Sequence, residues 1–325
     1  MLCCGGACHA SPRVLPLGDP ASPLRLEGKI QLPDVSGRID HLAIDLPHRL
    51  LFVAEYGNGT VDVVDLAASK VVGRIAGLHQ PQGVAVLRDG EIAVACGDGS
   101  VHFFAARDRH EIASLNLGGD ADNIRIDQRN GDVVVGYASG ALAVIDPQTH
   151  QVISTLKLPG HPEGFAMIGD VALINVPDDG SIIKADLGAG KITATWPTEL
   201  HRMNFPLDVS PDGKWAALAY RLPGTLQMRQ LSDGAIRSTR STCGDADGLF
   251  IDGARILVVC GSGHVDVASS TDPDADPVRV ATASGARTGL LVPEINTLFV
   301  AAPAQGGPAT IWMMSIKGES RKVIW

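Results

Sequence analysis

Short runs of alternating apolar and polar residues recur along the chain at a nearly constant interval. Examples are residues 42–45 (LAID), 124–127 (IRID) and 249–252 (LFID). Such alternation indicates a β-strand with one buried face. The copies can be aligned on one residue at or just before the start of each run, and these positions are His41, Gly83, Asn123, Gly164, Pro206, Gly248 and Gly289. Successive positions lie 40 to 42 residues apart, so the chain contains seven copies of one unit.

Each unit continues with three further apolar runs that are separated by turns rich in Gly, Asn and Asp. In the first unit these runs cover residues 50–54, 60–66 and 70–75, and in the third they cover residues 132–137, 141–146 and 151–156. Four strands joined by short turns form the blade of a β-propeller, and seven such sheets close into a ring. The sequence therefore predicts an all-β fold, a single seven-bladed propeller domain with four-stranded blades over residues 23–325.

The last unit is incomplete at its C-terminal end. Its three clear runs are residues 289–292, 297–301 and 310–315. We expect the fourth strand near the N-terminus, because residues 24–30 (LRLEGKI) have the same rhythm as residues 70–75. A ring closed by this N-terminal strand has no open edge that could pair with other chains. The alternative is that residues 322–325 supply the strand.

Length, charge and apolar content narrow the function classes. All-β architectures often reach 325 residues as one domain, and the acidic stretch 271–277 is expected to be a surface loop of the sixth blade. A formal net charge of −9 disfavours sequence-independent binding to nucleic acid, although a local basic patch would still permit it. No stretch is long and apolar enough to be a transmembrane segment. We expect a monomer.

The first ten residues, MLCCGGACHA, differ in composition from the rest of the chain. Small residues precede a possible cleavage point and a Pro-containing start at Ser11, which is typical of the end of a signal peptide. We interpret residues 1–10 as the remnant of a secretion signal, which places the protein in the periplasm or outside the cell. The alternative interpretation is a Cys-rich tail without a targeting role.

The positions of two cysteines also favour export. Cys243 precedes the first strand of the sixth unit, and Cys260 ends its second strand. Antiparallel strands place these ends side by side, so a disulfide is geometrically reasonable, and it would need an oxidising compartment. Cys96 has no partner at the matching site of the second unit and is expected to be a small buried residue.

The motif in residues 51–65 (LFVAEYGNGTVDVVD) resembles the YVTN repeat of the YncE-like β-propeller proteins, and residues 135–147 (VGYASGALAVIDP) are a looser copy. The resemblance extends over almost the whole chain after about Pro23. It implies a WD40-like repeat architecture, although the Trp-Asp and Gly-His marks of WD repeats are absent. Proteins of this family are typically exported, and the resemblance implies no single activity.

Candidate functional residues lie where the repeats differ, just before each inner strand. The inner strands of a propeller run along its central channel, so these segments gather at one mouth of the channel. Almost every unit contributes a polar or ionisable side chain there, and the candidates are Arg38, Asp40, His41, Gln82, Asp122, Asn123, His161, Glu163, Arg202, Asn204, Asp247 and Arg287.

Three interpretations of this polar mouth remain open. In the first, Arg38, Arg202 and Arg287 bind an anionic group, because a guanidinium donates paired hydrogen bonds to carboxylate or phosphate. In the second, Asp40, Asp122, Glu163 and Asp247, with Asn204, bind a divalent cation such as calcium. His41 or His161 would shift that site toward a transition metal. In the third, the same residues are turn formers and ion pairs that only close the channel.

Fewer features of the sequence favour catalysis. A metal-dependent, lactonase-like hydrolase would resemble the gluconolactonase class, but those enzymes typically have six blades. The sequence contains no Gly-x-Ser-x-Gly elbow and no nucleotide or haem motif. We therefore interpret the chain as an exported binding or interaction protein rather than an enzyme, with a small anionic or polar ligand or a protein partner at the mouth. The hydrolase at the same mouth is the alternative.

Overall fold

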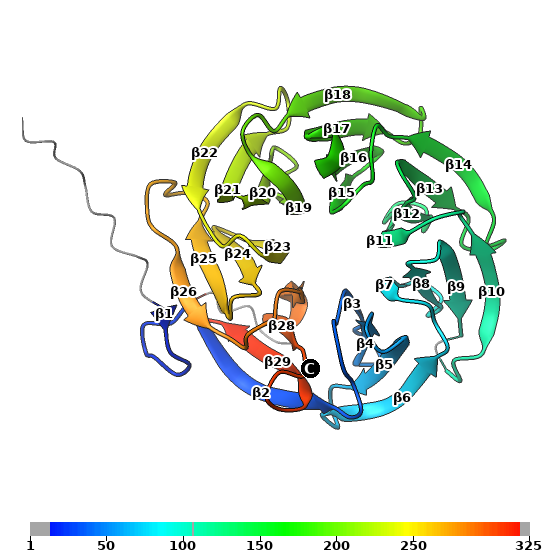
Figure 1. Cartoon of the computed structure of the whole chain (residues 1–325), viewed down its shortest axis with the longest axis horizontal. Coiled ribbons are helices and arrows are strands. Elements are labelled where there is room, and N and C mark those ends of the chain that lie inside the picture. The colour runs from blue at the N-terminus through cyan, green and yellow to red at the C-terminus, as the bar shows by residue number, and fades with distance from the viewer. Residues whose placement is uncertain (1–13, 106, 319–325) are drawn as a thin grey trace, which may run out of the picture.

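The strands form seven sheets arranged in a ring around a central channel (Figure 1). The computed structural model describes residues 14–105 and 107–318. Six sheets have four strands, and the remaining sheet has a fifth, β1 (Val14–Leu15), which pairs in parallel with β26 (Val278–Ala281). The only helical elements in these residues are two short 3-10 turns, η1 (Pro177–Asp179) and η2 (Pro293–Ile295). The predicted all-β seven-bladed propeller is confirmed.

Blades one to four follow the chain in order. Blade one contains β3 (Leu42–Asp45), β4 (Leu50–Glu55), β5 (Thr60–Asp65) and β6 (Lys70–Ala76). Blade two contains β7 (Pro81–Val86), β8 (Ile92–Cys96), β9 (Ser100–Phe104) and β10 (Glu111–Asn116). Blade three contains β11 (Ala121–Ile126), β12 (Val133–Tyr137), β13 (Ala141–Ile145) and β14 (Val152–Lys157). Blade four contains β15 (Phe165–Ile168), β16 (Val171–Val176), β17 (Ser181–Asp186) and β18 (Lys191–Pro197).

Blades five to seven complete the ring. Blade five contains β19 (Arg202–Val209), β20 (Trp215–Leu222), β21 (Gly224–Gln230) and β22 (Ile236–Ser241). Blade six contains β23 (Ala246–Asp252), β24 (Arg255–Cys260), β25 (His264–Ser269) and β26 (Val278–Ala281). Blade seven contains β27 (Gly289–Val292), β28 (Thr297–Ala302), β29 (Ala309–Ile316) and the N-terminal strand β2 (Leu24–Leu32).

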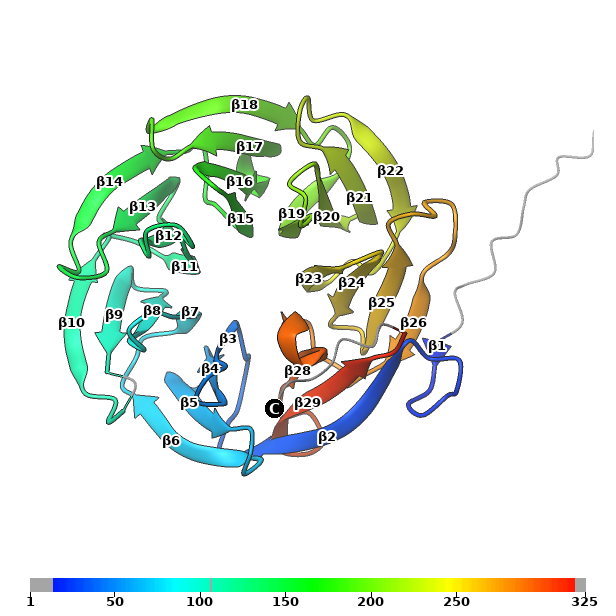
Figure 2. The ribbon, with the colours of Figure 1, turned by 180° about the vertical axis from the view of Figure 1, so that it is seen from behind.

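Strand β2 closes the ring as the outermost strand of blade seven. It runs antiparallel to β29, from the pair Leu24 and Ile316 to the pair Leu32 and Ala309. In both face-on views β2 lies along the outside of β29 (Figures 1 and 2). The prediction of N-terminal closure is therefore confirmed. Residues 322–325, the alternative source of this strand, lie outside the described residues.

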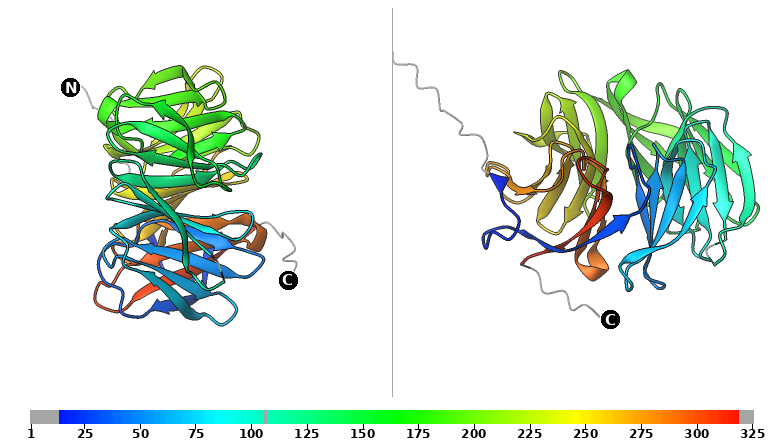
Figure 3. Two further views of the ribbon diagram at one scale, coloured as in Figure 1. Left: turned by 90° about the vertical axis from the view of Figure 1, so that its right-hand side faces the viewer. Right: turned by 60° about the horizontal axis from the view of Figure 1, so that its bottom comes forward.

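The hydrophobic core is divided into seven layers, one between each pair of neighbouring blades. Middle strands such as β4 and β5 are buried along almost their whole length because a blade covers each of their faces. Outer strands such as β6 and β10 alternate between exposed and partly buried positions because one face meets solvent. Seen from the side, the ring is thinner than it is wide (Figure 3). Because each core layer is shared by two blades, the packing of every blade depends on both of its neighbours.

Three further sequence expectations concern the cysteines, membrane spans and the signal remnant. Cys243 and Cys260 form a disulfide with Cα atoms 5.9 Å apart, as predicted, while Cys96 is a buried free thiol. None of the described helical segments has the length and apolar character needed to span a bilayer. The predicted signal remnant, residues 1–10, falls outside the described part of the chain.

Candidate functional site

A repeated irregularity at the start of the inner strands directs polar side chains into the channel. In β7, β11 and β23 the pairing with the second strand of the blade shifts register near the first residues. The residues at these shifts include Gln82, Asp122, Asn123 and Asp247. A β-bulge leaves a residue out of the ladder and changes the direction of its side chain. The bulges therefore explain why polar residues at the starts of buried strands face the channel.

Close backbone contacts between neighbouring blades fix the positions of these bulges. Gly164 donates a backbone hydrogen bond to the carbonyl of Phe205 in the next blade at 3.0 Å. A Cβ atom on Gly83 would lie 2.1 Å from the carbonyl oxygen of Asp122, and one on Gly164 would lie 2.5 Å from that of Phe205. Any larger residue would push the blades apart at the mouth. This close approach explains the glycine at the aligned position of several units.

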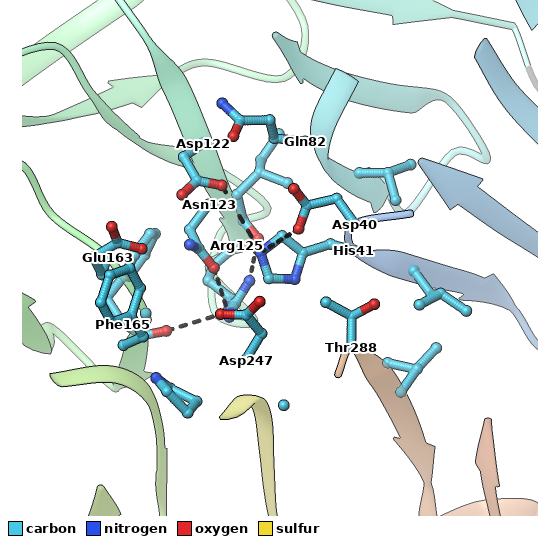
Figure 4. A pocket seen from close by; sticks show the side chains of 18 of the residues that line it. Asp40, His41, Gln82, Asp122, Asn123, Arg125, Glu163, Phe165, Asp247 and Thr288 are labelled. Carbon is cyan, nitrogen blue, oxygen red and sulfur yellow. Dashed lines mark hydrogen bonds and ion pairs between the residues drawn. The ribbon is translucent and has the colours of Figure 1, made fainter. Parts of the chain in front are cut away.

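The channel contains a cavity of about 790 Å³ that opens at this mouth. Ten of the twelve predicted residues line it, namely Arg38, Asp40, His41, Gln82, Asp122, Asn123, His161, Glu163, Asp247 and Arg287. Figure 4 shows several of these side chains directed toward one another across the channel. The ring therefore brings together polar residues from six of its seven blades.

Arginines dominate the side of the mouth formed by blades five to seven. Asp247 forms ion pairs with Arg221 and with Arg287, whose Nε lies 2.6 Å from the Asp247 carboxylate. Arg221 also donates to the carbonyl of Ala246, and its guanidinium lies 3.8 Å from the centroid of the Phe205 ring. Burial lowers the pKa of Arg221 to about 10, and the charge of Arg287 adds to this effect. Within the described residues Arg287 has no ion pair other than the one that its Nε forms with Asp247.

The boundary between the arginine side and the acidic side is formed by blade one. Arg38 forms an ion pair with Asp40 and lies 4.6 Å from the centroid of the Tyr56 ring. His41 Nε2 lies 3.8 Å from one carboxylate oxygen of Asp40 and 3.8 Å from one of Asp122. Burial lowers the pKa of His41, although the charge of Asp40 opposes this shift. This shift favours the neutral imidazole of His41.

Three side chains on the acidic side bring possible metal ligands together. One donor atom each from Asp122, His161 and Glu163 lies within 4.8 Å of the other two. Burial raises the pKa of Glu163 to about 7 and raises that of Asp122 well above its ordinary value, and the charge of Asp40 adds to both shifts. Asp40 and Asp247, the other two carboxylates predicted as metal ligands, are instead engaged by arginines.

A second ring of residues lies deeper in the channel, two positions after each alignment residue. Five of its members are apolar, namely Ala43, Ala85, Ala166, Phe250 and Leu291, and all seven line the cavity. Arg125 and Asp208 occupy the other two positions. Arg125 donates only to neutral acceptors, including the carbonyl of Phe165 at 3.1 Å and the side-chain oxygen of Asn123 at 3.2 Å. No described carboxylate forms an ion pair with it, and its burial lowers its pKa.

Two predicted site residues in blade five do not line the channel cavity. Arg202 is exposed and lines a neighbouring pocket of about 730 Å³. Asn204 is fully buried and donates to the side-chain oxygen of Asn175 and the carbonyl of Ser181, both at 3.0 Å. Both residues belong to β19, which begins at Arg202, whereas the prediction placed them in a turn before the strand. The extended strand, rather than a loop, therefore determines where the side chains of Arg202 and Asn204 point.

Several charged residues of the mouth are absent from the candidate set that was predicted from the sequence. Arg221 is the last residue but one of β20, the second strand of blade five, whose end reaches the same mouth as the starts of the inner strands. Asp120 precedes β11 and accepts a hydrogen bond from the side chain of Gln82 at 2.7 Å. Arg125 and Asp208 did leave a signal, because each is a charged residue at a position that is apolar in the other five units.

Comparisons with known proteins support the fold. No protein-family model and no curated protein matches the chain in sequence. A chain of hydrazine synthase from Kuenenia stuttgartiensis is similar in structure, with a TM-score of 0.71 and 18% identity over 87% of this chain and 98% of that chain. A chain of a mitotic checkpoint complex has a TM-score of 0.76 and 16% identity over 95% of this chain and 97% of its own length. The YncE-like resemblance remains a prediction.

Proposed function

We propose that the protein binds a small ligand bearing a carboxylate or phosphate group at the arginine side of the channel mouth. The observation that carries this proposal is Arg287, which lines the cavity and whose one ion pair with a described residue, to Asp247, is made through Nε. A planar guanidinium with free N–H groups is suited to paired hydrogen bonds with such an anion. Arg221 and Arg287 share one carboxylate, so this pair and Asp247 together carry a net positive charge.

The neighbouring side chains support a small ligand rather than a bare ion. The cavity volume of about 790 Å³ falls within the range typical of small-molecule sites. Gln82 and Asn123 line the same cavity and offer polar groups to hydroxyls or amides. An acidic group of a protein partner would meet the same arginines, and the propeller fold is compatible with that use. One structural neighbour comes from a multi-protein complex.

Replacing Arg287 by Ala is expected to weaken binding of inorganic phosphate or a short dicarboxylate by about tenfold or more, because a charge-assisted contact is lost. Titration calorimetry on metal-depleted protein would measure this change. Arg202→Ala is the matched control, since Arg202 is exposed and lies in the neighbouring pocket. Equal affinities for Arg287→Ala, Arg202→Ala and the unaltered protein would contradict the proposal.

We also propose that the protein works in the periplasm or outside the cell. The support is the disulfide between Cys243 and Cys260, because structural disulfides are typical of oxidising compartments and rare in the cytosol. Alkylation and peptide mapping of unfolded protein from the cell envelope should label Cys96 directly, and Cys243 and Cys260 only after reduction. Direct labelling of all three would argue against export.

A further inference from the structure

We infer that Asp122, His161 and Glu163 form a binding site for a divalent transition metal ion such as Zn²⁺. One donor atom from each residue lies within 4.8 Å of the other two, on the acidic side of the cavity. This inference is independent of the anion binding proposed above, because it concerns different residues and a cation. It rests on the unused donor atoms, the orientation of His161 and the charge of the cavity.

Neither carboxylate accepts a hydrogen bond from a described residue. Asp122 is 8% exposed, and its Oδ1 atom is buried without a hydrogen-bond donor. The Nε2 atom of His41, whose pKa is lowered by burial, lies 3.8 Å from that atom, beyond hydrogen-bond distance. No hydrogen bond or ion pair within the described residues involves the carboxylate of Glu163, which lines the cavity. A buried carboxylate without a donor or counter-ion is unfavourable, and a bound cation would remove that penalty.

His161 is held in the orientation that suits a metal ligand. Its Nδ1 donates a hydrogen bond to the carbonyl of Ala138, which fixes the tautomer with the lone pair on Nε2. Histidines that bind metals commonly donate their other ring nitrogen to a carbonyl or carboxylate in this way. The hydrogen-bonded histidine therefore distinguishes this group of residues from a cluster of acidic side chains alone.

The charge of the cavity also favours a divalent cation. Its lining contains the four arginines Arg38, Arg125, Arg221 and Arg287 and the six carboxylates Asp40, Asp120, Asp122, Glu163, Asp208 and Asp247. Fully ionised, these groups have a formal charge of −2, which one divalent ion balances. The excess negative charge lies in blades three and four, where Asp122 and Glu163 are located.

The donor set selects a class of metal. Calcium takes oxygen ligands, whereas imidazole with carboxylates suits Zn²⁺, Fe²⁺ or Co²⁺. At bond lengths of about 2.1 Å the donors of a tetrahedral zinc ion lie about 3.4 Å apart, so the three side chains need only small rotations. Three protein ligands leave one position open toward the cavity. A metal with an open position is also what the hydrolase alternative would require, but binding alone assigns no reaction.

The test uses the metal ions alone. Metal-depleted protein with its disulfide intact is titrated with Zn²⁺, Co²⁺ or Ca²⁺ and analysed by calorimetry, equilibrium dialysis and, for Co²⁺, visible absorption. We expect one equivalent of Zn²⁺ and weaker binding of Ca²⁺. His161→Asn keeps a donor for the carbonyl of Ala138 but removes the Nε2 lone pair. We expect this variant and the isosteric Glu163→Gln each to weaken Zn²⁺ binding by about 100-fold or more.

His110→Ala is the matched control, because His110 also contacts a carboxylate, Asp108, but is exposed on the surface. Zn²⁺ binding should be unchanged in this variant. Melting curves of all variants establish that they fold. The inference is overturned by the lack of stoichiometric binding, or by equal affinity in the His161→Asn and Glu163→Gln variants. A thiolate-to-cobalt charge-transfer band would also overturn it, because it would place the metal at the cysteines.

Discussion

A variant lacking residues 23–32 is expected to unfold at a far lower temperature than the complete chain. This segment contains β2, which forms the outer edge of blade seven. Leu24, Ile30 and Leu32 are each no more than 1% exposed. Burial of these three side chains contributes about 2 kcal/mol each to the free energy of unfolding. Their sum is comparable with the total stability of many domains. Thermal unfolding followed by circular dichroism would measure the loss.

The truncated protein also permits a direct test of strand pairing. A synthetic peptide covering residues 23–32 should restore much of the lost stability by adding back the edge strand. The same peptide with Ile30→Asp should not, because Ile30 is fully buried between blades seven and one. Deleting residues 322–325 is the matched control and should change the melting temperature little. A melting curve unaltered by loss of residues 23–32 would show that β2 does not stabilise the ring.

The fold could be predicted from the sequence because it depends on repetition. Seven copies of one strand pattern are visible in the chain, and blade seven lacks a strand whose rhythm reappears in residues 24–30. Strand pairing confirms that assignment. The extra strand β1 was not predicted, since its two residues are too short to show alternation.

The site was harder to predict because side-chain direction depends on bulges and on strand length. A shift of one residue reverses the face to which a side chain points. In blade five the inner strand starts early, so Asn204 is paired within the sheet and Arg202 faces the neighbouring pocket. Arg221 lies in a different strand from the predicted residues, and only the ring geometry brings it to Asp247. Positions along the chain therefore indicated which mouth is polar but not which groups pair.

The ion pairs of Asp247 with Arg221 and Arg287 allow a structural role of these arginines to be separated from a functional one. If the arginines only neutralise carboxylates, loss of an arginine should reduce stability and leave anion binding unchanged. If they bind an anion, Asp247 competes with that anion for the same N–H groups. Removing the charge of Asp247 should then affect stability and anion affinity in opposite directions.

Asp247→Asn is therefore expected to destabilise the protein by about 3 kcal/mol, because Arg221 and Arg287 lose their shared counter-ion in a largely buried setting. The same variant should bind inorganic phosphate about tenfold more tightly, since both guanidinium groups are released toward the cavity. Melting temperatures with and without phosphate, together with calorimetry, would measure both effects.

The matched control is Asp62→Asn, which removes a fully buried carboxylate paired with Arg74 in blade one, at 2.6 Å and outside the channel lining. It should lower stability by a similar amount, because it also leaves an arginine without its counter-ion. Its phosphate affinity should equal that of the unaltered protein, since neither partner faces the cavity. A gain in affinity confined to Asp247→Asn would link the arginines to anion binding. Destabilisation by both variants without any gain would mean that Arg221 and Arg287 only hold the ring together.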